Sequence, residues 1–128
     1  MNVPKELRYT KEHEWVRVEG GEAVVGVTDY AQSELGDVIF VELPAPGTRV
    51  AQLKGFGTID AVKTVSDLFA PVSGEVIAVN TALKDNPALV NQSPYAEGWM
   101  VRIRMDKAQE LDGLLNAQDY AKHLGAHA

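Results

Sequence analysis

The sequence contains no cysteine among its 128 residues. A disulfide framework and a thiolate metal site are therefore both excluded, and any redox chemistry would need an imported group. Basic residues are also scarce, because twelve lysines and arginines stand against eighteen aspartates and glutamates and leave a formal charge of -6. No basic cluster offsets this charge locally, so a nucleic acid backbone would be repelled and we predict no nucleic-acid partner.

Long apolar runs are missing as well. No stretch of about 18 apolar residues occurs, which predicts neither a membrane-spanning helix nor a membrane partner. The opening residues 1–5 have no apolar signal core and no Arg-rich transit stretch follows them, so we expect a cytoplasmic protein. With 45% hydrophobic residues the chain can form one real core. We predict a single domain over 1–128, with a β core at about 13–105 and a helical segment at about 106–124.

The common metal and nucleotide motifs are incomplete. The segment "HEWVR" at 13–17 lacks the second histidine of the metalloprotease pattern, and the histidines at 13, 123 and 127 have no spacing that would hold a metal. The "GFG" at 55–57 lacks the third glycine and the following helix of a dinucleotide loop. We therefore predict no metal site, no nucleotide site and no catalytic residue.

Short strands and one helix dominate the first third of the chain. The segment 14–27 reads as two strands around Gly20-Gly21, because glycine supplies the positive φ angles of a tight hairpin. The segment 28–36 predicts a short helix that Thr28 caps and that Gly36 ends in the left-handed conformation. The following "DVIFVELPAPG" predicts a strand and then a turn, since its prolines cannot donate ladder hydrogen bonds.

The last quarter of the chain changes to helical spacing. Asp106 and Gln109 suggest a capping box, after which three leucines would line one helical face: Leu111, Leu114 and Leu115. Asn116 can cap a second helix. Its apolar stripe at i, i+3, i+4 and i+7 would lie on the β core and consists of Ala117, Tyr120, Ala121 and Leu124.

An internal repeat is the most informative pattern. Residues 36–52 align with residues 74–92, because both copies open with Gly-acid-Val-Ile-x-Val and reach Val-x-Gln after a Pro-containing turn. Two such copies are too few for a solenoid, so we predict a sandwich with pseudo-two-fold symmetry in which each copy covers the apolar face of the other. The equivalent core positions would be Val38 and Val41 in the first copy, and Val76 and Val79 in the second.

Lys63 lies in an apolar, β-branched run between the two copies. Taken alone, such a lysine indicates the solvent-facing residue of a half-buried strand. The repeat, however, makes residues 53–73 a hairpin with Lys63 near its tip. A lone lysine at the tip of a hairpin, on a rigid two-sheet scaffold, is typical of a swinging-arm carrier whose amine is acylated.

Motifs along nearly the whole chain resemble one known family. They are "HEWV" at 13–16, "VGVTDYAQSELGD" at 25–37, "VELP" at 41–44, "AVKTVSD" at 61–67, "APVSGEV" at 70–76, "PALVN" at 87–91 and "SPYAEGW" at 93–99. In their order and spacing they are similar to the glycine cleavage system H proteins. The resemblance implies a mainly β fold, the lipoyl/biotinyl-type β sandwich called a barrel-sandwich hybrid, with a short internal helix and C-terminal helices.

The same resemblance implies a non-catalytic carrier with lipoate amide-linked to Lys63. Its partners would be glycine decarboxylase, the aminomethyltransferase, dihydrolipoamide dehydrogenase and a lipoate-attaching enzyme, and the chain would be a monomer. One departure is the sequence Asp60-Ala61-Val62-Lys63-Thr64, where the family often has Glu-Ser-Val-Lys-Ala. This change bears on recognition by the attaching enzyme and leaves the acceptor lysine intact.

Three carboxylates are implied in a cleft where the loaded arm rests. Glu14 and Asp67 match the acidic positions of the family, and Glu12 stands where a small polar residue is frequent. A carboxylate near an ammonium group gains little in open water and more in a partly dry cleft, so the pairing would be a latch of modest strength. The other interpretation of Glu14 and Asp67 is that both are ordinary surface carboxylates.

Three other functions share this fold. A biotin carrier typically has methionines beside its lysine, whereas Val62 and Thr64 stand here. A lipoyl domain of the 2-oxo acid dehydrogenase type is usually shorter, is tethered by a flexible linker and has no C-terminal helical tail. A non-acylated interaction protein of the same fold would be distinguished by its intact mass.

Overall fold

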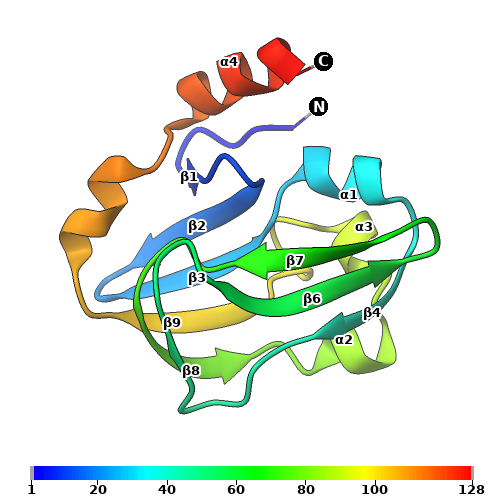
Figure 1. Ribbon diagram of the computed structural model, residues 1–128, viewed down its shortest axis with the longest axis horizontal. Helices are drawn as coiled ribbons and strands as arrows, with labels where there is room; N and C mark the ends of the chain where they lie inside the picture. The colour runs from blue at the N-terminus through cyan, green and yellow to red at the C-terminus, as the bar shows by residue number, and fades with distance from the viewer. Residues whose placement is uncertain (1, 128) are drawn as a thin grey trace.

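The computed structural model describes residues 2–127, which form two antiparallel β sheets with short helices at their margins (Figure 1). The larger sheet has the strand order β1-β2-β3-β9-β8-β5, and the smaller one has the order β4-β6-β7. The larger sheet consists of β1 (Arg8–Tyr9), β2 (Glu14–Glu19), β3 (Glu22–Val27), β9 (Val101–Met105), β8 (Gly74–Val79) and β5 (Arg49–Val50). The smaller sheet consists of β4 (Val38–Glu42), β6 (Gly55–Ala61) and β7 (Val65–Phe69). The predicted mainly β sandwich is confirmed.

The β2–β3 hairpin forms where the sequence predicts it. Its strands pair from Glu14 opposite Val27 to Glu19 opposite Glu22, which leaves Gly20 and Gly21 as a two-residue loop. Only Gly20 adopts a positive φ, of 65°. One glycine with positive φ is enough because a turn of this length can place its second residue at negative φ.

The two copies of the repeat begin in opposite sheets and meet in the larger one, where β5 of the first copy pairs with β8 of the second. The first copy begins with β4 in the smaller sheet, and the second begins with β8 in the larger sheet. Val38, Val41 and Val76 are buried as predicted, whereas Val79 is only half-buried at the margin of the core. After these strands the copies diverge. The first continues into strand β5, and the second forms the one-turn helices α2 (Ala82–Asp85) and α3 (Leu89–Gln92).

Helix α1 (Asp29–Leu35) begins and ends at the predicted residues. The hydroxyl of Thr28 accepts a hydrogen bond from the Ala31 N–H at 3.2 Å, which caps the start. Gly36 ends the helix with φ 76° and ψ -156°. The positive φ is as expected, but the ψ angle lies outside the left-handed helical region, in an extended conformation that essentially only glycine populates.

The first C-terminal segment differs from the predicted α-helix. It is a 3-10 helix, η1 (Ala108–Gly113), and Asp106 does not cap it but forms an ion pair with Arg49. The carboxylate of Glu110 instead accepts hydrogen bonds from the N–H and the hydroxyl of Ser73, at 2.7 and 2.8 Å. These long-range bonds fix η1 against the sandwich, which sequence spacing does not reveal.

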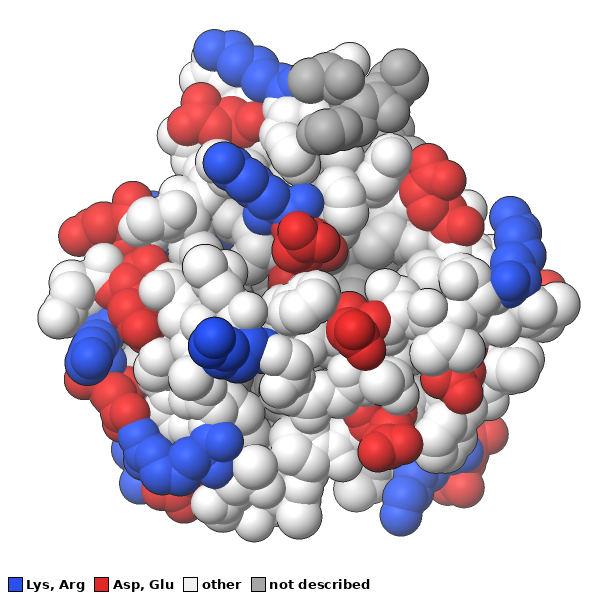
Figure 2. Space-filling model, in the orientation of Figure 1, with Lys and Arg blue, Asp and Glu red and all other residues white. Residues whose placement is uncertain are grey.

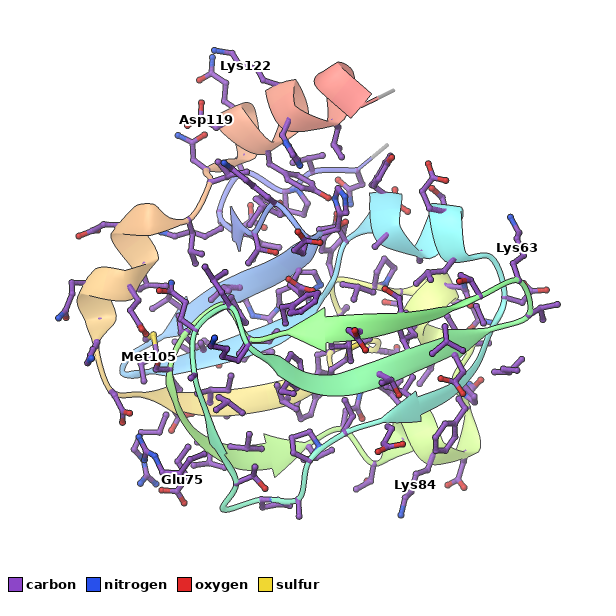
Figure 3. The ribbon with its side chains drawn as sticks, viewed as in Figure 1. Lys63, Glu75, Lys84, Met105, Asp119 and Lys122 are labelled. Atoms are coloured by element: carbon purple, nitrogen blue, oxygen red, sulfur yellow. The ribbon has the colours of Figure 1, made fainter. Side chains whose placement is uncertain are left out.

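Helix α4 (Ala117–His127) follows the predicted pattern more closely. The side chain of Asn116 accepts a hydrogen bond from the Asp119 N–H at 2.8 Å and so caps the helix. Tyr120 is fully buried, but Ala121 is exposed and does not join the stripe. In Figure 3 the labelled Asp119 and Lys122 point outward from α4, opposite to the face that covers the N-terminal segment. Within residues 2–127, no helix is both long and apolar enough to cross a membrane.

Candidate functional site

Lys63 lies at the exposed tip of the hairpin formed by β6 and β7. Two backbone hydrogen bonds fix this tip: the Ala61 N–H donates to the Thr64 carbonyl at 2.8 Å, and the Val62 N–H donates to the Asp37 carbonyl at 3.0 Å. The second bond ties the tip to the loop that follows α1. In Figure 3 the Lys63 side chain points outward at this end of the molecule, whereas Lys84 projects from α2 on a different side.

The surroundings of Lys63 are apolar and uncrowded. An ideal Cβ at Gly36 would lie 3.0 Å from Cε of Lys63, so the lysine stem rests against a backbone without a side chain. Val62 and Val65 are 70% and 62% exposed beside it. Across the part of the chain that the structure describes, Lys63 forms no ion pair within 4.0 Å. Its amine therefore projects from a fixed backbone with no carboxylate bound to it.

The structure brings the three predicted carboxylates together in one cleft of about 140 Å³. Glu12 precedes β2, Glu14 is the first residue of β2, and Asp67 comes from β7. The deeper walls are apolar and include Val27, Leu35, Ile59 and Leu68. Figure 2 shows acidic and basic side chains interspersed on the face that carries the β6–β7 hairpin. The cleft thus combines an apolar interior with negative charge.

Glu34 is a fourth carboxylate that lines the cleft, and sequence reasoning missed it. It lies on α1 at i+4 from Tyr30 and at i+3 from Ala31, and both of these residues also line the cleft. Residues at these spacings share one helix face, so the helical pattern of 28–36 contained the signal that identifies it. Glu12, Glu34 and Asp67 are exposed, which places their charges at the cleft mouth.

Glu14 is not a surface carboxylate. Only 2% of its surface is exposed, and its two carboxyl oxygens accept hydrogen bonds from the Thr10 hydroxyl at 2.5 Å and from the Phe69 N–H at 3.2 Å. Burial raises the pKa of Glu14 to about 7, and the charge of Glu12 adds to the rise, while the hydrogen bonds from Thr10 and Phe69 oppose it. Near neutral pH the cleft therefore contains a carboxyl group that readily gains or loses a proton.

Histidines and tryptophans near the cleft have structural partners. The ring of His13 lines the cleft, and its Nδ1 lies 2.8 Å from the Tyr120 hydroxyl. Trp15 is fully buried and its indole N–H donates to the Pro94 carbonyl at 2.9 Å, and Trp99 packs in the same cluster. Among the side chains that the structure describes, those of residues 2–125, no three histidines, aspartates or glutamates are grouped so that they could hold a metal ion.

The raised pKa of Glu14 predicts a pH-dependent stability. A carboxyl whose pKa rises from 4.5 to about 7 on folding stabilises the folded state below pH 4.5, and this contribution is lost as the pH rises through 7. The free energy of unfolding is expected to fall by about 2 kcal/mol between pH 5 and pH 8 on this account. Urea unfolding at several pH values measures it. Glu14→Gln should remove this part of the pH dependence of the free energy of unfolding. Glu97→Gln, at an exposed site, should keep it. An unchanged slope in Glu14→Gln would contradict the assignment.

Known proteins resemble the chain over nearly its whole length. The family model described as "Glycine cleavage H-protein" matches residues 7–127. The glycine cleavage system H protein of Geobacillus kaustophilus is 58% identical over 120 residues, which cover 94% of each chain. That of Chlorobium phaeobacteroides is 53% identical over 128 residues, 98% of this chain and 100% of its own. The crystal structure of a glycine cleavage system H protein from Mycobacterium marinum superposes with a TM-score of 0.89 at 38% identity and covers 96% of this chain and 99% of that chain.

Proposed function

Since this chain belongs to the glycine cleavage H-protein family, we propose that Lys63 is the residue through which it carries lipoate. The chain is a lipoyl carrier of the glycine cleavage system, and a carrier of this family presents its lipoyl group to other proteins. The observation that supports Lys63 is its place at an exposed hairpin tip whose backbone is fixed by hydrogen bonds. The exposed apolar neighbours Val62 and Val65 leave the amine open to an attaching enzyme.

The residues around Lys63 fit an amide-linked lipoyl arm. The lysine stem rests against Gly36, and the preceding residue, Leu35, already lines the cleft. The arm can therefore pass over Gly36 toward walls that are apolar, as its hydrocarbon chain requires. When attached, lipoate supplies a disulfide that can accept an aminomethyl group together with two electrons.

The cleft carboxylates would hold the ammonium of an aminomethyl cargo. Glu12, Glu34 and Asp67 supply negative charge at the mouth, and Glu14 supplies a carboxyl group from the floor. Because a nearby cation favours the charged form of a carboxyl, docking of the ammonium would cause Glu14 to release the proton that it partly retains near pH 7. Glu14 would thus be charged when the cation is docked and partly neutral when the cleft is empty.

The proposed partners follow from this role. Glycine decarboxylase would load the aminomethyl group, the aminomethyltransferase would remove it, and dihydrolipoamide dehydrogenase would reoxidise the arm. A lipoate-attaching enzyme would modify Lys63 beforehand. We propose that the chain meets these enzymes as a monomer and contributes no catalytic residue of its own.

The latch is tested by neutralising two cleft carboxylates. Lipoylated wild type and the Glu14→Gln/Asp67→Asn variant are loaded with the aminomethyl group, and its release is followed without the transferase. The variant should release the group about 3- to 10-fold faster, since a partly dry ion pair is worth about 1 kcal/mol. High salt should produce part of the same acceleration in wild type.

Two controls sharpen this experiment. The Asp85→Asn/Glu97→Gln variant removes the same number of carboxyl groups at exposed positions outside the cleft, so its release rate should match that of wild type. Lipoylation and reoxidation should stay unchanged in both variants, because neither step involves the ammonium. If the cleft variant and wild type release the group equally fast at low salt, these carboxylates do not hold the arm.

A further inference from the structure

The hydroxyl of Tyr120 connects the segment that contains His13 with the start of α1, and both segments form walls of the cleft. It lies 2.8 Å from Nδ1 of His13 and 2.7 Å from Oγ1 of Thr28. Tyr120 is fully buried although it belongs to α4, and Figure 1 shows this helix lying along the N-terminal segment. A tyrosine side chain from the end of the chain thus reaches the polar centre between the entry to β2 and the start of α1.

Both partners of this hydroxyl belong to segments that line the cleft. His13 itself lines it, and Thr28 caps α1, whose residues Tyr30, Ala31 and Glu34 form another wall. The two segments also meet directly, because the Thr28 N–H donates to the His13 carbonyl at 3.0 Å. The Tyr120 hydroxyl adds a side-chain bridge between the same two segments, and so sets their spacing.

The backbone of His13 needs this support. Its φ is 75°, in the left-handed region that non-glycine residues seldom occupy, and such a conformation persists only where its surroundings hold it. The centroid of the His13 ring lies 4.7 Å from that of the Tyr30 ring and 5.8 Å from that of the Tyr120 ring. Burial raises the pKa of Tyr120 above the ordinary value of a tyrosine, so its hydroxyl keeps its proton and can donate one hydrogen bond.

We propose that Tyr120 is a positioning residue for the cleft, and that its hydroxyl holds His13 and the start of α1 at the spacing that excludes water from a docked arm. This inference rests on the proposed docking of the arm. Tyr120 touches neither the arm nor its cargo, and it acts through His13 and Thr28. Helix α4 thereby helps to set the shape of the cleft.

Tyr9 offers a matched control. Its ring stacks on that of Tyr120 with centroids 4.5 Å apart and planes 6° apart, it is equally buried, and its hydroxyl donates to the Pro4 carbonyl at 2.6 Å. Tyr120→Phe and Tyr9→Phe therefore each remove one buried hydroxyl from the same stack. Only the Tyr120 hydroxyl contacts a residue that lines the cleft.

The lipoylated variants are loaded with the aminomethyl group, and its release is followed without the transferase. Tyr120→Phe should release it about 3- to 10-fold faster than Tyr9→Phe, because it removes the hydrogen bonds of the hydroxyl to His13 and Thr28. In the unlipoylated chain, the 15N NMR shift of Nδ1 of His13 should change in Tyr120→Phe and stay unchanged in Tyr9→Phe. Equal release rates, or an unchanged His13 signal, would overturn the proposal.

A second variant covers the case in which Tyr120→Phe does not fold. Asparagine tolerates the left-handed conformation, so His13→Asn should keep the backbone and remove the ring that Tyr120 holds. It should speed release, and adding it to Tyr120→Phe should speed release less than it does in wild type, because Tyr120→Phe has already broken the bond to His13. If release from His13→Asn is as slow as from wild type, the proposal is wrong. Failure of the carboxylate latch is seen separately, as equal release from Glu14→Gln/Asp67→Asn and wild type.

Discussion

Lys63→Arg is expected to abolish the attachment of lipoate while the fold stays intact. Arginine keeps the positive charge and a long aliphatic stem, but its guanidinium is not an acyl acceptor under the conditions in which a lysine amine reacts. Residue 63 lies at an exposed hairpin tip, and the hydrogen bonds that fix this tip are made by the backbones of Ala61, Val62 and Thr64. Intact mass after expression with lipoate measures the outcome, and the thermal unfolding curve checks the fold.

Other exposed lysines provide the controls for this experiment. Lys54 precedes β6 and Lys84 lies on α2, and both are exposed. Lys54→Arg and Lys84→Arg should each keep the full mass increase of one lipoyl group. Lipoate on Lys54 or Lys84 in the wild type would show that Lys63 is not the attachment site. A wild type that never gains the mass would favour a non-acylated interaction protein.

Gly57→Ala is expected to destabilise the protein by about 3 kcal/mol or more. A Cβ at this position would lie 2.3 Å from the carbonyl oxygen of Glu42, on the neighbouring strand β4. The obstacle is backbone in a paired strand, so it cannot turn away as a side chain can, and overpacking at such a site forces the strands apart. Urea unfolding followed by tryptophan fluorescence measures the loss of free energy.

Gly55→Ala is the matched control on the same strand. A Cβ there would lie 3.9 Å from the Leu68 carbonyl oxygen, which is an ordinary contact. This variant should lose less than about 1 kcal/mol, the usual range for a substitution that meets no obstacle. Equal losses in the two variants would mean that close strand approach does not explain Gly57. The "GFG" segment thus has a structural reason, since Gly57 permits β6 and β4 to pair closely.

The sequence predicted those parts of the fold that depend on local or repeated patterns. The Gly20 hairpin, the helix from Thr28 to Gly36 and the capping by Asn116 all rest on residues that are close in the sequence. The repeat predicted that β4 and β8 belong to opposite sheets, and they do. The predicted mutual cover of the two copies is not seen, because Val38 and Val41 pack in one core cluster and Val76 and Val79 in another. The half-burial of Val79 shows that the symmetry weakens at the margin of the core.

The parts that the sequence did not predict depend on contacts between distant residues. The segment after Asp106 is a 3-10 helix that Glu110 joins to Ser73, which lies 37 residues away. Glu14 is buried because Thr10 and Phe69 satisfy its oxygens, and no local pattern distinguishes it from a surface glutamate. The Tyr120 hydroxyl reaches His13 across 107 residues, and its spacing predicted only that it packs. Polar contacts of this kind follow from the tertiary fold.

The strand order of the larger sheet has a consequence for how the chain folds. Strand β9 lies between β3 and β8 and pairs Val101 with Val25, although these residues are separated by most of the chain. During synthesis the β3 edge of the β2–β3 hairpin therefore has no partner strand until β9 is made, whereas the two strands of the β6–β7 hairpin are adjacent in the sequence. A topology with such distant pairings places folding of the whole chain in the slow range of milliseconds to seconds. The hairpin that carries Lys63 thus depends on local pairing, whereas the larger sheet can be completed only after β9 has been synthesised.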